Sequence, residues 1–288
     1  MPKFSVFERK VETLAKLNRP HIAFGLASPD ALILKSLKKA KKYADITLVG
    51  PKAISKIADF KTLIFENPEE KLATMLVKGQ IEGIVRGTVD DFKTYETYQK
   101  LTGENNTSIP TLMKDPLGRE FFLTPVSNPE GWSKEERLEL AQNIAGFVKE
   151  WGIKPKIAVF TGERHETYPR KKRIKSGVVG ILNKTYEDAE WIVKNLKKNG
   201  YDAKNWAIDL NPAVEAGCNL LVAVNGMIGN QILRVVLFCG GKILTCTRAG
   251  LSHPYEDNSR TEEDFEFHVK WLVAMINKKK FGENEKNL

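Results

Sequence analysis

Cysteine and histidine are scarce in this chain of 288 residues, which has three cysteines and four histidines. An odd number of cysteines without a C-x-x-C pair argues against a disulfide scaffold and a structural zinc site. The histidines show no H-E-x-x-H spacing, so we expect no metal site. The cysteines lie in or beside apolar segments and are expected to be small buried residues: Cys218, Cys239 and Cys246.

Long apolar runs and an N-terminal leader are also missing. The longest apolar segments, residues 219–224 and 228–238, are shorter than the roughly 20 residues that a membrane-spanning helix needs. Residues 1–4 lack the apolar core of a signal peptide. These features favour a cytoplasmic protein with no membrane partner.

Two nucleotide-binding fingerprints, the P-loop and G-x-G-x-x-G, do not occur. The chain is nevertheless basic, because 45 Lys and Arg residues outnumber 36 Asp and Glu residues and give a net charge of +9. Such a surplus is typical of proteins that bind nucleic acid or phosphorylated metabolites. The basic segment 170–175 indicates nucleic acid, but only Tyr168 beside it offers a ring for base stacking, so this alternative is the less favoured one.

Short apolar segments alternate with helical spacing along the chain. Ser133 and Glu136 form a capping box before one helix, and Ser28 and Pro29 have the residue types of the cap and first position of another. This alternation predicts α/β layers with a mostly parallel sheet. The expected strands are residues 21–27, 46–50, 63–65, 83–86, 120–126, 157–161, 220–225 and 243–247.

The most informative segment is residues 251–264, a polar turn before the last helix. Ser259 and Arg260 precede a helix start, where unpaired N–H groups and the helix dipole favour an anion. We therefore expect them to bind a phosphate or a developing oxyanion. Thr261 and Asp264 match a capping box, so Asp264 is either a helix cap alone or also a general base.

Two other turns and a histidine are candidate ligand contacts. Asn225, Gly226, Gly229 and Asn230 follow an apolar strand, and these glycines either bring backbone N–H groups to a ligand or only make a tight turn. The other candidates end a strand or adjoin the polar turn, and for the arginine among them a surface salt bridge is the alternative: Arg86, Gly87, Thr88 and His253.

Several of these segments together resemble the phosphotransacetylases. Residues 250–260 resemble the turn of that family, in which Asp-Leu-Ser-Arg-Gly leads into the last helix. Residues 124–129 and 152–159 resemble its Ala-Val-Asn-Pro and Gly-Ile-x-Pro segments. Residues 40–51 and 80–87 match the first lobe of the family, and Gly229-Asn230 matches its Gly-Asn pair, so the likeness runs through most of the chain.

The resemblance implies two three-layer α/β/α lobes with a cleft between them, as in isopropylmalate dehydrogenase. Residues 1–124 and 247–288 would form the first lobe and residues 125–246 the second. A homodimer is the implied assembly. In the implied acyl transfer between acyl phosphate and coenzyme A, Ser259 and Arg260 would stabilise developing charge and Asp264 would deprotonate the thiol.

The sequence departs from the phosphotransacetylase pattern at several of these places. The turn has Ser-Arg-Thr in place of Ser-Arg-Gly, and the spacing to Asp264 is shorter. The Leu-Arg-Pro that follows Arg86-Gly87 in the family is missing, and residues 162–167 replace its Ser-Thr-Lys-Gly-Ser loop. The chain more closely resembles a divergent methanogen branch, the methanogenesis marker or methyltransferase-related Mtx subunit X proteins.

These observations predict a transferase-like protein that binds a small phosphorylated or coenzyme-type ligand in the cleft, such as coenzyme A or a phosphorylated metabolite, without being an efficient phosphotransacetylase. The first alternative is a non-catalytic accessory subunit of a methyltransferase system, with a methyltransferase partner subunit. The second is a nucleic-acid binder acting through residues 170–175.

Overall fold

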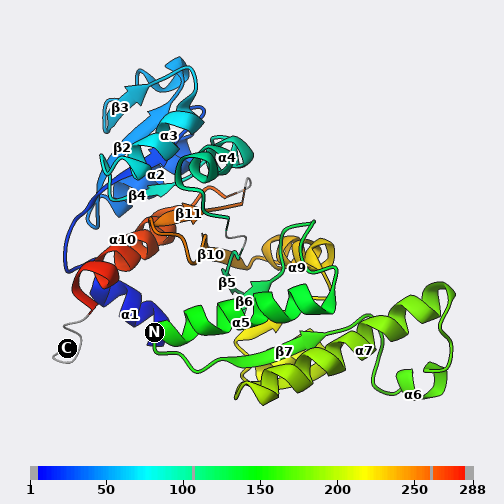
Figure 1. Ribbon diagram of the computed structural model, residues 1–288. Coiled ribbons are helices and arrows are strands. Elements are labelled where there is room, and N and C mark those ends of the chain that lie inside the picture. The colour runs from blue at the N-terminus through cyan, green and yellow to red at the C-terminus, as the bar shows by residue number, and fades with distance from the viewer. Residues whose placement is uncertain (1–5, 106–107, 260–261, 283–288) are drawn as a thin grey trace. The chain divides into compact units, whose positions relative to one another are not determined.

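The computed structural model describes residues 6–105, 108–259 and 262–282. The chain divides into two compact units (Figure 1). Unit 1 comprises Met1–Thr107 and Leu244–Leu288, and unit 2 comprises Ser108–Ile243. The first boundary falls before residue 124 because strands β5 (Thr111–Lys114) and β6 (Glu120–Thr124) pair with one another, and β6 also pairs with β9 (Leu220–Val222) of unit 2.

The strands of unit 1 form a mostly parallel sheet. Only the β10–β11 pair is antiparallel, through Cys246 opposite Asp257 and Thr247 opposite Glu256. The strands, in their order across the sheet, are β3 (Lys61–Ile64), β2 (Asp45–Gly50), β1 (His21–Gly25), β4 (Gly83–Val85), β11 (Tyr255–Asp257) and β10 (Lys242–Thr247).

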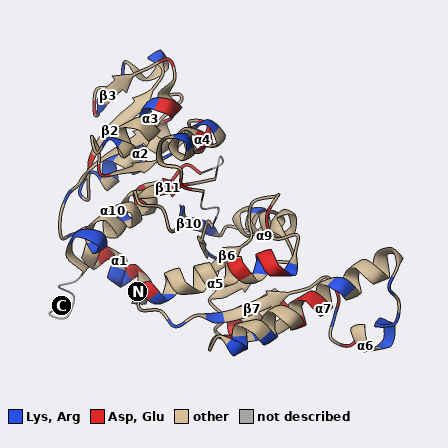
Figure 2. Ribbon diagram, viewed as in Figure 1, with Lys and Arg blue, Asp and Glu red and all other residues tan. Residues whose placement is uncertain are grey.

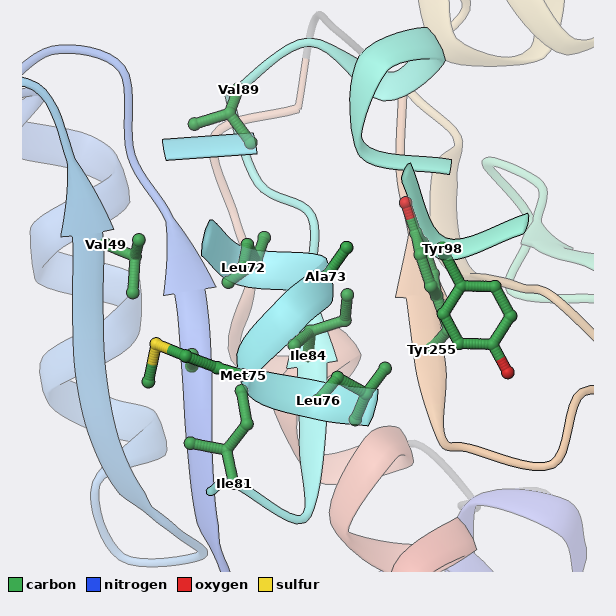
Figure 3. Close-up of a cluster of buried hydrophobic side chains, with 11 residues drawn as sticks. Val49, Leu72, Ala73, Met75, Leu76, Ile81, Ile84, Val89, Tyr98 and Tyr255 are labelled. Carbon is green, nitrogen blue, oxygen red and sulfur yellow. The ribbon is translucent and has the colours of Figure 1, made fainter. Parts of the chain in front are cut away.

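Helices cover both faces of this sheet. A Cβ built on Gly83 would lie 2.9 Å from the side chain of Ile276, whereas Ile84 packs in a cluster with Leu72 and Leu76 (Figure 3). Successive residues of a strand point to opposite faces, so α10 and α3 lie on opposite sides of β4. The helices of unit 1 are α1 (Val6–Ala15), α2 (Ala31–Ala40), the 3₁₀ turn η1 (Lys52–Ile54), α3 (Pro68–Val77), α4 (Asp91–Thr102) and α10 (Glu266–Phe281).

Unit 2 has the same kind of construction. Its strands are parallel except for the β5–β6 pair. In order across the sheet they are β5 (Thr111–Lys114), β6 (Glu120–Thr124), β9 (Leu220–Val222), β7 (Lys156–Phe160) and β8 (Asp202–Ala207). Its helices are α5 (Lys134–Glu150), α6 (Tyr168–Lys171), α7 (Gly177–Lys198), α8 (Leu210–Glu215) and α9 (Gly226–Phe238).

The α/β class predicted from the sequence is confirmed, and each expected strand is present with somewhat different ends. The structure adds β5, β8 and β11. β8 alternates exposed charged residues with buried ones, and β11 consists of Tyr-Glu-Asp, a composition that does not predict a buried strand. No helix in the described part of the chain is long and apolar enough to cross a membrane.

Two local predictions were wrong. The cap of α2 is Asp30, not Ser28, because the Asp30 carboxylate accepts hydrogen bonds from the backbone N–H groups of Leu32 and Ile33. Cys239 is exposed, since it follows the last residue of α9, while the other two cysteines are buried as expected. The Ser133 cap of α5 is confirmed by its 3.1 Å hydrogen bond from the Glu136 N–H group.

Candidate functional site: the turn between β11 and α10

The carboxyl ends of β1 and β4 lie side by side in unit 1. The chain leaves β1 for β2 and β3 on one side and returns to β4 on the other, which makes this a topological switch point. In α/β sheets such a point, at the carboxyl ends of the strands, is where ligands bind. β11 runs parallel to β4, so the turn after Asp257 reaches the same edge.

Gly87 and Thr88 hold the ends of β1 and β4 together. The Thr88 hydroxyl accepts a 2.8 Å hydrogen bond from the Ala27 N–H group, and the Thr88 N–H group donates to the Gly25 carbonyl. Gly87 has a φ of +66°, and a Cβ there would lie 2.0 Å from the Gly25 oxygen. Only glycine allows the two backbone segments to come this close, so Gly87 has a structural role. Its contact with a ligand stays a prediction.

Arg86 is buried, with 3% of its side chain exposed, so the surface salt bridge considered from the sequence is not what it forms. Its Nε donates to Asp257 over 2.9 Å, and Nη1 donates to the Gly87 carbonyl over 2.6 Å. Its Nη2 donates to the backbone carbonyl of Asn258. Arg86 therefore joins the end of β4 to the end of β11 and fixes the first residue of the turn.

Asp257 is the buried carboxylate that this arrangement depends on. It also accepts a 2.8 Å hydrogen bond from Arg248, whose guanidinium lies 3.7 Å from the centre of the Tyr95 ring. Burial acts to raise the pKa of Asp257, but the charges of Arg86 and Arg248 and the N–H group of Asn258 outweigh it and hold that pKa below its usual value. Asp257 is therefore a buried carboxylate between two arginines.

His268 holds the far end of the turn. This fully buried imidazole lies between two carboxylates, with Nδ1 2.6 Å from Glu256 and Nε2 2.7 Å from Glu262. Burial alone would lower the pKa of His268, but the two carboxylates raise it to about 10. The imidazole is therefore protonated at neutral pH and donates from both nitrogens.

Glu262 connects His268 to the turn. One of its carboxylate oxygens contacts His268, and the other accepts a hydrogen bond from the Ser259 N–H group. Glu256 is anchored in turn by the hydroxyls of Thr245 and Thr247, at 2.7 and 2.6 Å. The turn from Asn258 to Glu262 is thus held at one end by Arg86 and Asp257 and at the other by His268.

The sequence placed its candidate catalytic residues in and after this turn. Ser259 is half-buried and follows Asn258, whose side-chain amide donates to the carbonyls of Gly87 and Ser259. The structure therefore brings the Arg86–Gly87 segment and the Ser259 segment together. Arg260 and Thr261 lie outside the described residues.

The predicted start of the last helix was wrong. α10 begins at Glu266, not at residue 262, so Asp264 lies before the helix and not in its first turn. Asp264 is exposed and its carboxylate accepts a 3.2 Å hydrogen bond from the Glu266 N–H group. The N-cap residue of α10 is Phe265, so Asp264 contacts the helix start from outside it, and its role as a base stays a prediction.

His253 lies at the opposite end of β11 from Ser259. Its Nδ1 is 3.1 Å from the hydroxyl of Tyr98 and 2.8 Å from that of Ser252, and Tyr98 also donates to Glu104. Three strand residues separate His253 and Pro254 from the turn, which corresponds to roughly 10 Å along the strand. The structure does not bring this histidine together with the Ser259 turn.

The glycine-rich turn after β9 belongs to unit 2. Asn225 caps α9 through a 2.9 Å hydrogen bond from the Ile228 N–H group, and Asn230 donates to the Val126 carbonyl. A Cβ on Gly226 would lie 1.6 Å from the Ser127 oxygen, and one on Gly229 would lie 1.8 Å from the Pro125 oxygen. Because these glycines have no Cβ, the backbone of residues 125–127 can pack directly against them. Their contact with a ligand stays a prediction.

This close packing predicts a strong contrast between two helical glycines of unit 2. Gly229→Ala is expected to destabilise the protein by about 1–3 kcal/mol, because the backbone of Pro125 must move. Gly146→Ala in α5 meets open space and is expected to stabilise by about 0.5–1 kcal/mol. Urea denaturation measures both changes, and a Gly229→Ala protein as stable as the Gly146→Ala protein would contradict this packing.

The basic segment 170–175 also lies in unit 2, around α6 (Figure 2). All six of its residues are exposed, and Lys175 pairs with Glu187. Nucleic-acid binding by this segment stays a prediction. Within the described ranges, no three His, Cys, Asp or Glu side chains gather as metal ligands.

Sequence reasoning missed the residues that fix the turn: Asp257, Glu262, His268 and Arg248. A buried charge carries no periodic signal, because acidic residues in a polar turn look like solvated ones. The one available signal was His268, which occupies a position on the same helix face as the expected buried residues Leu272 and Ile276.

The solved structures that this chain resembles include a phosphotransacetylase and a phosphotransacylase. A phosphotransacetylase from Streptococcus pyogenes matches 96% of this chain and 99% of its own, with a TM-score of 0.66 and 13% identity. A branched-chain phosphotransacylase from Enterococcus faecalis V583 matches 89% of this chain and 98% of its own, with a TM-score of 0.63 and 17% identity. Because the sequence identity is so low, this similarity establishes the fold and nothing about the activity.

Sequence comparison identifies the family, although no family model matches the chain. A Methanosarcina barkeri protein named "Putative methyltransferase mtx subunit X" is 28% identical over 231 residues, 79% of this chain and 82% of its own. Its namesake from Methanosarcina mazei is 30% identical over 235 residues, 80% of this chain and 81% of its own. The chain therefore belongs to the methyltransferase mtx subunit X family, with a phosphotransacetylase-like fold.

Proposed function

We propose that the chain is a transferase-like protein that binds a small phosphorylated or coenzyme-type ligand at the turn between β11 and α10. The turn lies at the carboxyl ends of β4 and β11, beside the switch point of unit 1. Ser259 and Arg260 supply a hydroxyl and a guanidinium suited to a phosphate or a carbonyl oxygen. The phosphotransacetylase-like fold supports this ligand class.

The observation that carries the proposal is that buried charges hold the turn at both ends. Arg86 fixes the carbonyl of Asn258, and the protonated His268 fixes Glu262, which accepts from the Ser259 N–H group. A site that binds an anion tightly needs its donors held in place before the ligand arrives. A loop that only connects a strand to a helix does not need two buried ionic anchors.

We do not expect this protein to catalyse acyl transfer efficiently. Arg86 is engaged within unit 1, with donors directed to Asp257 and to backbone carbonyls, and the sequence lacks the second arginine that the phosphotransacetylase pattern would supply. We therefore expect ligand binding together with little or no acetyl transfer between acetyl phosphate and coenzyme A.

Thermal denaturation with phosphate, acetyl phosphate, coenzyme A and nucleotides tests the proposal. A ligand that binds only the folded protein at one hundred times its Kd adds about 2.7 kcal/mol of stability and raises Tm. We expect such a rise for at least one of these anions, and we expect Ser259→Ala and Arg260→Ala to show a smaller rise than the wild type.

The matched control is Arg173→Ala, which removes an exposed arginine from the basic segment of unit 2 and should leave the rise unchanged. Equal rises in the wild type and in both turn variants would reject the turn as the binding site. Loss of the rise in Arg173→Ala alone would instead favour the basic segment, and rapid turnover of coenzyme A would show that acyl transfer was wrongly set aside.

A second candidate function follows from the names of the relatives, which describe a subunit of a methyltransferase. In that case the chain is an accessory protein with a methyltransferase partner, and the turn between β11 and α10 binds no ligand. No rise in Tm with any of the anions would favour it. A homodimer stays a prediction, and sedimentation equilibrium tests it directly.

A further inference from the structure

Unit 2 contains a buried arginine that has no acidic partner. Arg137, in the first turn of α5, is 2% exposed. Its Nη2 donates to the Phe160 carbonyl over 2.9 Å, and its Nε is buried without a hydrogen-bond partner. Among the described residues no carboxylate forms an ion pair with it. Burial lowers the pKa of Arg137 to about 10, and the more distant charge of Asp188 acts in the opposite direction.

Arg86 in unit 1 shows how this chain treats a buried guanidinium when it is structural. There Nε meets the Asp257 carboxylate, and the other nitrogens meet backbone carbonyls. An uncompensated buried charge is costly, and an orphan Nε–H group adds to that cost. Arg137 therefore has the properties of a cation whose counter-ion comes from outside the chain.

Arg137 also contacts the part of the sheet where ligands commonly bind in α/β proteins. Phe160 is the last residue of β7, and β7 lies between β8, which follows it in the chain, and β9, which comes later. The carboxyl ends of β7 and β9 thus form the switch point of unit 2. The segment beside Arg137 reaches the start of α9, because a Cβ on Gly131 would lie 3.3 Å from Arg137 and the Gly226 N–H group donates to Glu130.

We propose that Arg137 is the centre of an oxyanion site in unit 2, separate from the Ser259 turn and independent of the proposed function. The occupant is a phosphoryl or carboxylate group, which the guanidinium binds through Nε and a second nitrogen. Because the side chain is buried, the group that reaches it is small: inorganic phosphate, or the end of a larger molecule.

Thermal denaturation in phosphate-free buffer, with and without added sodium phosphate, tests this site. Sodium acetate serves as the carboxylate arm and potassium chloride as the ionic-strength control. The measurements use the Ser259→Ala background, so that any binding at the turn is already removed. We expect a rise in Tm of about 5 °C with one of the two oxyanions at one hundred times its Kd, and none with chloride.

Arg137→Met in the same background should abolish that rise. Without oxyanion its Tm should equal or exceed that of the parent protein, because an uncompensated buried charge has been replaced by an apolar chain. Arg137→Lys, which keeps the charge but loses the planar fork, should keep a smaller rise.

Three results would overturn the site. The first is an Arg137→Met protein that is unfolded or has a lower Tm in phosphate-free buffer, which would show that the guanidinium is structural. The second is a Ser259→Ala parent whose Tm responds to neither oxyanion; if the wild type does respond, the turn remains supported. The third is a response that survives in Arg137→Met.

Discussion

Replacing Arg86 with methionine is expected to lower the free energy of unfolding by about 3–5 kcal/mol. The substitution leaves the buried Asp257 carboxylate with Arg248 but without Arg86, and it removes the Arg86 donors from the carbonyls of Gly87 and Asn258. The loss should also release the turn, so ligand binding should weaken at temperatures where the variant is still folded. Urea denaturation measures the first effect and titration with the stabilising anion measures the second.

Arg19→Met is the matched control, because Arg19 is an exposed arginine of the same unit that donates to the Lys41 carbonyl. Its effect should stay within about 0.5 kcal/mol. Arg86→Lys should fall between the two, since an ammonium group keeps the charge but cannot reach the same partners together. An Arg86→Met protein as stable as Arg19→Met would show that Arg86 does not join β4 to β11.

Replacing His268 with leucine should have an effect of similar size, about 3–5 kcal/mol at pH 7. It leaves the buried Glu256 and Glu262 carboxylates facing one another without the positive charge between them. His21→Gln is the control, because His21 lies in the same unit but its Nε2 contacts only the neutral hydroxyl of Thr47. Urea denaturation compares the three proteins.

The pH dependence distinguishes a charged His268 from a neutral one. The pKa of His268 is raised from 6.5 to about 10 on folding, so its contribution to stability is complete below pH 6.5 and is lost as the pH rises towards 10. The wild type and His268→Leu should therefore differ most just below pH 6.5, still differ strongly at pH 7, and converge towards pH 10. A difference that stays constant from pH 7 to 9.5 would mean that the imidazole is not protonated.

The fold was largely predictable because it depends on periodicity. Apolar strands such as β1 and β7 and the capped helix α5 carry local signals that survive without tertiary context. β11 was not predictable, since its Glu256 and Asp257 are buried only because Thr247, His268 and two arginines meet them there. Arg86 is 171 positions from Asp257, and the other partners, 9 to 12 positions away, belong to β10, the residue after it and α10 rather than to β11 itself.

The sequence singled out the turn after Asp257 as a candidate site, but it did not reveal the contacts that hold this turn in place. The Ser259 turn stood out in the sequence because a hydroxyl and a guanidinium together suit an anion, although α10 begins only at Glu266. Arg86 was recognised as important, but its direction depends on the carboxylate of Asp257, which is 171 positions away. The register of α10 failed for a similar reason: the Phe265 N–H group donates to Ser36 of α2, a contact that no local pattern contains.

We propose that the turn between β11 and α10 binds an anion and that buried ionic contacts fix this turn before the anion arrives. The most direct test is a crystal structure of the protein soaked with whichever anion raises Tm most in the thermal experiment. We predict that this anion contacts the side chains of Ser259 and Arg260, with the Arg86–Asp257 and His268–Glu262 contacts unchanged. An anion bound elsewhere, with both side chains directed away from it, would contradict the claim.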